Sequence, residues 1–132
     1  MSRLPVLIAM LVCCTPALVA GQAPADLVQA MRARDQAIDK ADLPTWEKLT
    51  GAAFTLVNET GHVYTRAARV AELKKAKPSA SPACVQDHVI MFANARAAIR
   101  RCLAGGIWWI DVWEKTNSGW QVVSVQGTPA AR

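Results

Sequence analysis

The chain has few of the side chains that most often carry enzymatic or metal chemistry. Among its 132 residues there are two histidines, one tyrosine and four cysteines. The histidines, His62 and His88, are far apart and have no companions at the spacing of metal ligands, so we expect no metal site. No serine or cysteine stands in a catalytic arrangement with a histidine and an acid, and no glycine-rich phosphate loop is present. The sequence therefore predicts no catalytic residue and no cofactor.

The chain also lacks an apolar run long enough to span a bilayer, which takes about 20 residues. Its N-terminal run, Leu4 to Cys14, follows Arg3 and leads into small residues that end in ALVAGQA. A charged start, a short apolar run and a small-residue end are typical of a secretory signal peptide. We predict a signal peptide over 1–20 and one domain over 21–132, which makes the protein periplasmic or secreted and free of the membrane after cleavage. A lipoprotein anchor at Cys13 or Cys14 is the alternative.

The first testable prediction concerns this cleavage. The native protein is expected to begin near Gly21 or Gln22, because the small residues there follow the apolar run at the usual place. Intact-mass measurement of protein from its own host gives the N-terminus directly. A chain that keeps residues 1–20 and carries no lipid contradicts the prediction.

Acidic residues are fewer than basic ones, yet the basic residues are spread along the chain. The formal net charge is +5, and it becomes +4 when Arg3 is removed with the signal peptide. The one cluster, ELKKAK, ends a predicted helix, where cations interact favourably with the helix dipole. A basic balance can indicate nucleic-acid binding. The even spread and the predicted export favour solvated faces instead, so we expect no nucleic-acid partner.

Helical periodicity comes first in the chain, and strand patterns follow it. Asp42 and Thr65 stand where N-caps of the second and third helices belong. The predicted elements, in order, are helices over about 24–40 and 42–50, a short hairpin over 54–64, a helix over 66–76, and strands over 84–92, 96–104, 107–115 and 120–128. Helices that are segregated from an antiparallel sheet form an α+β domain, in which they cover one face of the sheet.

Several short motifs occur in the order seen in a known superfamily. Phe54 and Val57 precede a turn with Gly61, and DVWEK, GW and VVSVQGTP follow near the end. Together with the order of elements, they resemble the nuclear transport factor 2-like superfamily, in the branch related to SnoaL-like polyketide cyclases and ketosteroid isomerase. The resemblance runs from Leu27 to Pro129. It implies a cone-shaped α+β fold with about three N-terminal helices on a curved antiparallel sheet that encloses a hydrophobic pocket, and a homodimer.

The residues of isomerase chemistry are mostly missing. Isomerases of that superfamily use a general-base carboxylate with a tyrosine and a protonated aspartic acid. The one tyrosine, Tyr64, precedes the third helix, and the helical period turns Asp35 and Asp39 to solvent. Glu59 falls in a turn, so Asp111 is the only acid on an interior strand face, and one carboxylate is no acid–base pair. We therefore expect a domain that binds a small hydrophobic ligand or a partner. The alternative is an isomerase, cyclase or dehydratase acting on a small hydrophobic carbonyl compound.

The stretch GIWWIDVWEKTNSGW holds four of the five tryptophans and also holds Asp111. A two-residue turn at 117–118 would place Asp111 opposite Ser124 and Trp109 opposite Gln126. That register puts the polar side chains on one face and the apolar side chains on the other, as strand alternation allows. We predict a small polar patch of Asp111, Ser124 and Gln126 on the wall of a pocket.

An aromatic wall with a few polar groups is typical of small-molecule sites. The predicted ligand-pocket residues are Trp46, Phe54, Trp109, Asp111, Trp113, Ser124 and Gln126. Filling of the core is the alternative role of the tryptophans. A buried carboxylate must pair with a cation or take a raised pKa. Arg100, on the preceding strand, is the candidate cation, and a pair with it would make Asp111 structural.

The two cysteines outside the predicted signal peptide are Cys84 and Cys102. They are symmetric about Ala93, the centre of a predicted turn, and would therefore lie opposite each other on paired strands. Export supplies an oxidising compartment. We predict a disulfide between them; two separate buried thiols are the alternative.

Overall fold

The computed structural model describes residues 22–131, and the predicted signal peptide lies outside the described residues. The elements are α1 (Ala25–Asp39), α2 (Leu43–Lys48), β1 (Thr50–Val57), β2 (Val63–Thr65), α3 (Arg66–Leu73), β3 (Gln86–Met91), β4 (Ala97–Ala104), β5 (Ile107–Thr116) and β6 (Gly119–Pro129). The predicted order of helices and strands is confirmed. Within 22–131, no helix is long and apolar enough to cross a membrane.

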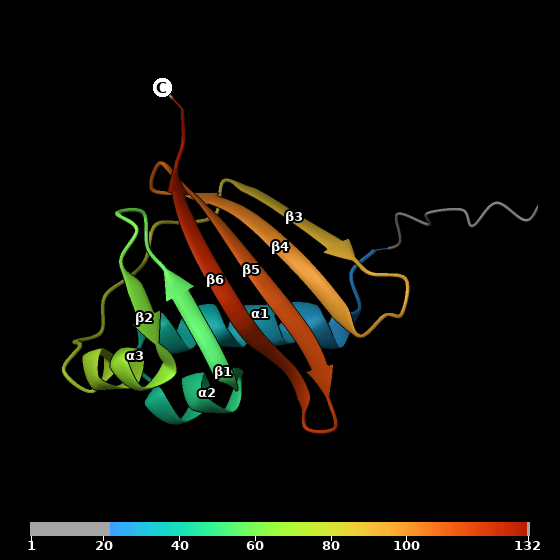
Figure 1. Ribbon diagram of the computed structural model, residues 1–132, viewed down its shortest axis with the longest axis horizontal. Coiled ribbons are helices and arrows are strands. Elements are labelled where there is room, and N and C mark those ends of the chain that lie inside the picture. Colours follow the sequence, from blue (N-terminus) through green and yellow to red (C-terminus); the bar gives the residue numbers. More distant parts are fainter. Residues whose placement is uncertain (1–21, 132) are drawn as a thin grey trace, which may run out of the picture.

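The strands form one open, six-stranded sheet in the order β2-β1-β6-β5-β4-β3. Every pair of neighbours is antiparallel except β1 and β6, which run parallel. The sheet is therefore mixed, and the prediction of a purely antiparallel sheet is wrong at this one pair. Parallel neighbours need a long crossover connection, and here the chain from β2 to β5 supplies it. α1 crosses one face of the sheet, called the inner face, and no described helix covers the opposite, outer face (Figure 1).

The two predicted N-caps are confirmed. The carboxylate of Asp42 accepts a hydrogen bond from the backbone N–H of Thr45, 3.2 Å away, at the start of α2. The hydroxyl of Thr65 accepts one from the backbone N–H of Ala68, also at 3.2 Å, at the start of α3. Each side chain satisfies a donor that the first turn of a helix leaves free.

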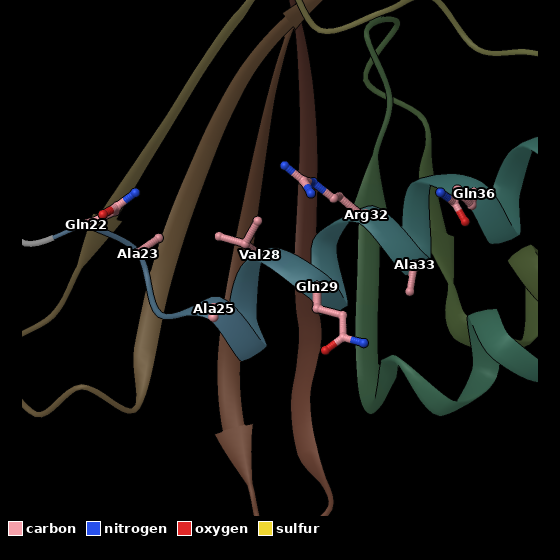
Figure 2. Close-up of a pocket in the computed structure, with 8 residues that line it drawn as sticks. All are labelled: Gln22, Ala23, Ala25, Val28, Gln29, Arg32, Ala33 and Gln36. Atoms are coloured by element: carbon pink, nitrogen blue, oxygen red, sulfur yellow. The ribbon is translucent and has the colours of Figure 1, made fainter.

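α1 buries one side against the sheet and keeps the other in solvent. An open hollow of about 740 Å³ runs along the solvent side, lined by Gln22, Ala23, Ala25, Val28, Gln29, Arg32, Ala33 and Gln36 (Figure 2). Arg32 is the only charged side chain among these residues. The hollow lies on the far side of the helix from the sheet, so it is not the interior pocket that the sequence predicts.

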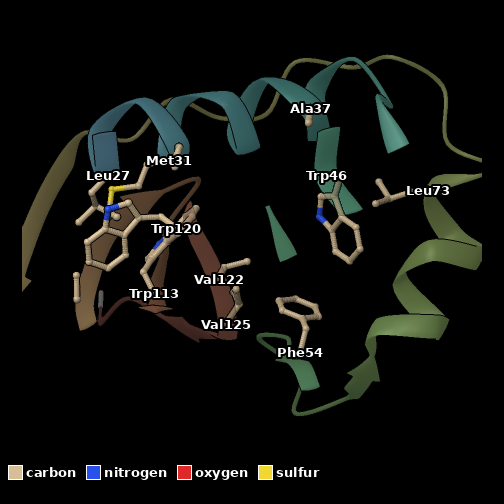
Figure 3. Close-up of a cluster of buried hydrophobic side chains, with 12 residues drawn as sticks. Leu27, Met31, Ala37, Trp46, Phe54, Leu73, Trp113, Trp120, Val122 and Val125 are labelled. Atoms are coloured by element: carbon tan, nitrogen blue, oxygen red, sulfur yellow. The ribbon is translucent and has the colours of Figure 1, made fainter. Parts of the chain in front are cut away.

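The hydrophobic core lies between α1 and the inner face of the sheet (Figure 3). Its largest fully buried side chains are Trp46, Trp113, Phe54, Leu27 and Val122. The Trp46 and Phe54 rings meet edge to face, with centroids 5.5 Å apart. Three of the predicted pocket residues, Trp46, Phe54 and Trp113, are therefore packed into the core, as large aromatic side chains often are.

The register of the last hairpin changes half-way along the strands. The two-residue turn at 117–118 is confirmed, because Thr116 pairs with Gly119 and the pairing continues to Trp113 and Val122. Val123 then forms a bulge, an extra residue with no partner on β5. A Cβ on Gly51 would lie only 3.1 Å from the Cγ1 atom of Val123, so glycine at this position of β1 makes room for the bulge.

Beyond the bulge, the predicted register is wrong by one residue. Asp111 lies opposite Val125, and Trp109 lies opposite Gly127. Since a shift of one residue moves a side chain to the other face, Ser124 and Gln126 lie on the outer face of the sheet. The predicted polar patch of Asp111, Ser124 and Gln126 is therefore not formed.

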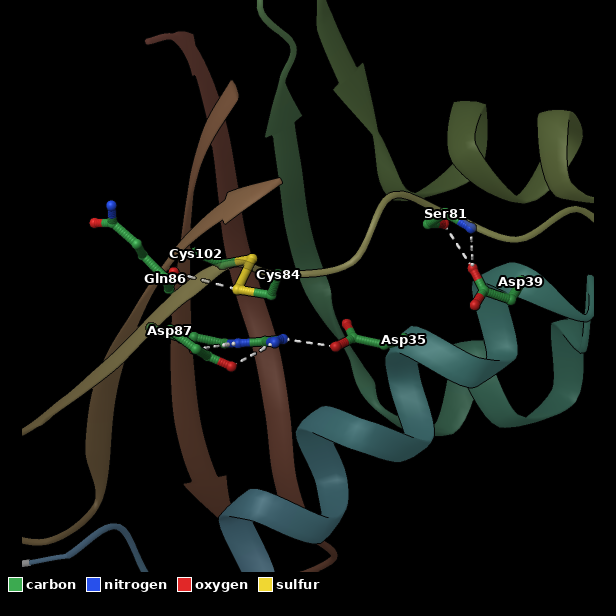
Figure 4. Close-up of polar contacts among 8 residues, drawn as sticks. Asp35, Asp39, Ser81, Cys84, Gln86, Asp87 and Cys102 are labelled. Carbon is green, nitrogen blue, oxygen red and sulfur yellow. Dashed lines mark hydrogen bonds and ion pairs between the residues drawn. A yellow bond between two sulfur atoms is a disulfide. The ribbon is translucent and has the colours of Figure 1, made fainter. Parts of the chain in front are cut away.

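Cys84 and Cys102 form a disulfide, with Cα atoms 5.6 Å apart (Figure 4). The predicted pairing is confirmed, but the predicted register is not, because Asp87 is the residue opposite Cys102. The loop between β3 and β4 is longer than predicted, and the backbone N–H of Phe92 bonds to the carbonyl of Ala97 across it. Cys84 lies just before β3 and still comes within bonding distance of Cys102.

Candidate functional site

Five charged residues gather between α1 and the inner face of β3, β4 and β5. Arg100 and Asp111 are direct partners on neighbouring strands, and both are buried. Asp87 comes from β3, and Arg34 and Asp35 come from α1. These five residues, two cations and three carboxylates, are called the charged cluster below. Its buried members must be compensated by charge or hydrogen bonds, since an isolated charge in an apolar interior is costly.

Arg100 is fully engaged by two carboxylates of the charged cluster. Its Nε and Nη2 atoms donate to the two carboxylate oxygens of Asp87, both at 2.9 Å, and Nη1 donates to Asp35 at 2.8 Å (Figure 4). Burial disfavours the charge of Arg100, but these hydrogen bonds and charges raise its pKa above the ordinary value. The predicted pair of Arg100 with Asp111 is wrong, because each of the three guanidinium nitrogens donates elsewhere, two to a bidentate carboxylate on β3 and one to a carboxylate on α1.

Arg34 and Asp111 are the buried members without such contacts. Arg34 is 5% exposed and Asp111 is 6% exposed. The Nε atom of Arg34 is buried and has no hydrogen-bond partner. In the described part of the chain, the Asp111 carboxylate forms neither an ion pair nor a side-chain hydrogen bond. The phenyl ring of Phe54 lies 5.9 Å from the guanidinium carbon of Arg34, close enough for a cation–π contact.

Arg34 and Asp111 affect each other's pKa through their charges. Burial raises the pKa of Asp111, and the charges of Arg34 and then Arg100 oppose that rise. Burial also lowers the pKa of Arg34, and the charge of Asp111 is the largest influence that opposes it. Each group is therefore the other's main counter-charge, although the two side chains do not touch.

Arg34 is a residue of the charged cluster that is not among the predicted site residues. The even spread of the basic residues predicts a solvated side chain at this position instead. The signal was present in the spacing. Leu27, Met31, Arg34 and Ile38 follow one another at intervals of four, three and four residues, which is one face of a helix. An arginine at that spacing within an apolar stripe indicates a buried cation.

Asp35 also differs from the prediction. The helical period predicts that Asp35 faces solvent, and its side chain is 48% exposed. Its carboxylate nevertheless forms an ion pair with Arg100. A half-exposed position at the edge of the helix face lets the carboxylate reach the sheet while part of it stays in water.

Trp109 has a packing role on the inner face. A Cβ on Gly127, its partner across β5 and β6, would lie 2.7 Å from the Cζ3 atom of Trp109. The indole therefore lies directly over the glycine, which is the one residue that allows such a close approach.

Two hollows of the described chain lie outside the charged cluster. Besides the one along α1, a second of about 260 Å³ lies where the end of α1 meets α3 and the segment 76–81. Within residues 22–131, no group of histidine, cysteine and acidic side chains is arranged to hold a metal ion.

The chain is similar to known proteins in its structure and not in its sequence. By sequence, no protein family and no curated protein matches the chain. By structure, the chain is similar to an NTF2-like protein from Cytophaga hutchinsonii, with a TM-score of 0.69, 13% identity, and coverage of 78% of this chain and 94% of that one. The chain has the nuclear transport factor 2-like fold.

Two further solved structures share the nuclear transport factor 2-like fold. One, from Streptomyces avermitilis, carries the provisional name of dehydratase, with a TM-score of 0.67, 17% identity, and coverage of 81% of this chain and 95% of that one. The other is the CaMKII hub from S. rosetta, with a TM-score of 0.68, 16% identity, and coverage of 85% and 100%. At these identities the similarity shows the fold alone.

Within this nuclear transport factor 2-like fold, Tyr64 is not part of the charged cluster. It lies in β2, where its ring meets the His62 ring edge to face, with centroids 4.4 Å apart. β1 and β6 separate β2 from β5, the strand of Asp111. The cluster therefore joins Asp111 to arginines and not to a tyrosine.

Proposed function

We propose that the protein is a small-ligand-binding domain whose ligand contacts Arg34, between α1 and the inner face of the sheet. The observation that carries the proposal is the buried Nε atom of Arg34, which has no hydrogen-bond partner. A buried donor without a partner costs about 1–3 kcal/mol, and proteins seldom keep one without a reason. A ligand that accepts this hydrogen bond would remove the cost.

The buried side-chain atoms without a hydrogen-bond partner in the described chain are all N–H donors. Besides Arg34 Nε, they include Nε1 of the core residues Trp46, Trp113 and Trp120. The surrounding side chains are the apolar core residues of α1 and the sheet. This composition favours a mainly hydrophobic ligand with one or more oxygen acceptors.

The charge of the site favours a neutral acceptor. Asp111 already balances Arg34 through space, so a second carboxylate beside it would add an unfavourable like charge. A carbonyl oxygen accepts from a guanidinium without adding charge. The proposed ligand class is therefore a small hydrophobic carbonyl compound.

Native mass spectrometry of protein purified from its own host tests the proposal. The expected result is an added mass of one small organic molecule per chain, which is lost in Arg34→Met because the donor is gone. Arg32→Met is the matched control, since Arg32 is exposed on the solvent side of α1, and it should keep the added mass. Circular dichroism of each variant confirms that it is folded. No added mass in the unaltered protein, or one that survives Arg34→Met, contradicts the proposal.

An enzyme acting on the same class of compound is the second candidate. It is favoured by the raised pKa of Asp111, which burial causes, because a raised pKa makes a carboxylate a stronger base. Against it, the fold of residues 22–131 brings no tyrosine to Asp111, and the two acids that it does bring there, Asp35 on α1 and Asp87 on β3, are bonded to Arg100. Binding without catalysis is therefore the leading proposal.

Export and self-association complete the proposed function. We propose a periplasmic or secreted protein, on the charged, apolar and small-residue order of residues 1–20. We also propose a homodimer, because the uncovered outer face of the sheet exposes Ile90 and Ile110, and because some solved structures with this fold are named as hub or association domains.

A further inference from the structure

β3 forms one edge of the sheet, and the side of the strand that faces away from β4 is open. It is the last strand in the order β2-β1-β6-β5-β4-β3, and no described element lies beyond it (Figure 1). Gln86, Asp87 and His88 are exposed in succession, so side chains on both faces of this strand reach solvent. An uncovered edge presents a row of backbone N–H and C=O groups with which another strand can pair.

The backbone groups that point away from the sheet can be assigned from the pairing of β3 with β4. The backbone N–H of Phe92 donates to the carbonyl of Ala97 at 3.0 Å, so these two residues are a hydrogen-bonded pair. In an antiparallel ladder, hydrogen-bonded and non-bonded pairs alternate, and the register is regular along the whole of β3. Every second residue before Phe92 therefore bonds to β4. The residues between them, whose N–H and C=O groups face the open side, are Asp87, Val89 and Met91.

Exposed apolar side chains are concentrated at this edge. Of the five large hydrophobic side chains that are exposed within residues 22–131, three lie in β3 or directly beside it: Val85 at 73%, Ile90 at 48% and Phe92 at 46%. β3 also contains neither proline nor lysine, the residues with which proteins often protect an edge strand from pairing. An added strand would therefore find both free backbone groups and apolar surface to bury.

The inner side of the same edge exposes negative charge. Arg100 is bonded to Asp87 and to Asp35, so two carboxylates share one guanidinium (Figure 4). The side chains of Asp87 and Asp35 are 45% and 48% exposed, whereas that of Arg100 is 9% exposed. The charge that reaches solvent beside β3 is therefore negative, and it would attract a lysine or arginine of an added strand.

This charge favours a different chain over a second copy of this one. β3 contains no lysine or arginine. His88 lies on the opposite face of the strand from Asp87, because neighbouring residues of a strand alternate between faces. A second β3 strand would thus bring no cation to Asp87 in any register. A segment of another protein can supply one.

We propose that β3 binds an extended segment of another protein, which joins the sheet as an additional strand. The segment has apolar residues beside Val89, Ile90 and Met91 and a lysine or arginine beside Asp87. Backbone hydrogen bonds to the open side of β3 provide affinity, and the alternating side chains provide specificity. The site is separate from the ligand site proposed at Arg34, so either proposal can fail without the other.

Fluorescence anisotropy with a short labelled peptide of valine and threonine that ends in one lysine tests the proposal. The expected result is saturable binding. A matched peptide with glutamate in place of the lysine should bind at least about fivefold more weakly, because like charges opposite each other in a sheet are unfavourable. Absence of saturable binding by the lysine peptide overturns the proposal, and equal binding of the two peptides overturns the role of the cation.

Val89→Pro is expected to weaken binding of the lysine peptide at least about tenfold. Proline removes the N–H on the open side of β3 and leaves the bonds to β4 in place. Val63→Pro is the matched control. Val63 is also exposed, and its N–H faces the open side of the other edge strand, since the neighbouring pair Asn58–His62 is the hydrogen-bonded one. This control should bind the peptide as the unaltered protein does.

A second variant keeps the test decisive if Val89→Pro does not fold. Ile90→Lys retains every backbone hydrogen bond and changes a side chain that is already 48% exposed. It should fold normally by circular dichroism and bind the lysine peptide at least about threefold more weakly, because apolar contact is lost and a cation is added. Unchanged binding by the folded Ile90→Lys variant would show that the peptide does not lie along β3.

Amide hydrogen exchange measured by NMR distinguishes an added strand from a peptide that only covers the surface. The lysine peptide should slow the exchange of the N–H groups of Asp87, Val89 and Met91. Those of His88 and Ile90 already bond to β4 and should change little. Equal slowing of all five contradicts strand addition. Slow exchange of the first three without peptide, increasing with protein concentration, would show that a second copy occupies the edge, and would also overturn the proposal.

Discussion

At neutral pH, Asp111→Asn is expected to be about 3 kcal/mol less stable than the double variant Arg34→Met/Asp111→Asn, near the low end of the range for leaving one partner of a buried charge pair uncompensated. Asp111 is the largest counter-charge of Arg34, which is only 5% exposed. Asparagine has almost the same shape, so the loss comes from a buried cation left without compensation. Denaturant unfolding of the single and the double variant measures the difference.

The double variant Arg34→Met/Asp111→Asn is the control for this effect. It removes both charges, so no buried charge is left without compensation. Equal stability of the single and the double variant would contradict the coupling and would favour the enzyme candidate, in which Asp111 acts on a ligand.

In the single variant Arg34→Met, the free energy of unfolding is expected to fall as the pH rises. Burial already holds the pKa of Asp111 above its ordinary value, and loss of its main counter-charge, Arg34, raises that pKa further. Because the native state then binds the proton more tightly than the unfolded chain, stability is full at low pH and falls as pH rises through the native pKa. Arg34→Met should therefore be more stable at about pH 5 than at about pH 7.5, a difference that the double variant should lack.

Removal of the disulfide is expected to cost about 3 kcal/mol, the usual effect of opening a loop of this size by the chain-entropy account. Cys84 and Cys102 are separated by 18 positions, and their bond ties the segment before β3 to β4. The same segment is held to the end of α1, where Ser81 donates to the Asp39 carboxylate from its backbone N–H at 2.9 Å and from its hydroxyl at 2.6 Å (Figure 4). Denaturant unfolding of Cys84→Ser/Cys102→Ser, compared with the oxidised protein, measures the loss.

Reduction provides an independent check of the same bond. A reductant should lower the stability of the unaltered protein to that of the double serine variant and leave that variant unchanged. Two reactive thiols in the unfolded, unreduced protein would show that the bond is not formed.

The order of elements was predictable because it depends on neighbours in the sequence. Helical and strand periods, the caps Asp42 and Thr65, and the turn at 117–118 each involve residues a few positions apart. These features, together with the short motifs, were enough to indicate the nuclear transport factor 2-like fold and the pairing of the two cysteines.

The details of the site were decided by contacts between residues far apart in the sequence. The bulge at Val123 is accommodated by Gly51, which only the parallel pairing of β1 with β6 brings beside it. Arg100 bonds to Asp35, 65 positions away in the sequence. The carboxylate opposite Arg100 on β5, that of Asp111, therefore has Arg34 as its main counter-charge. A sequence pattern shows which face a residue occupies, but the partner of a buried charge depends on which elements are packed against that face.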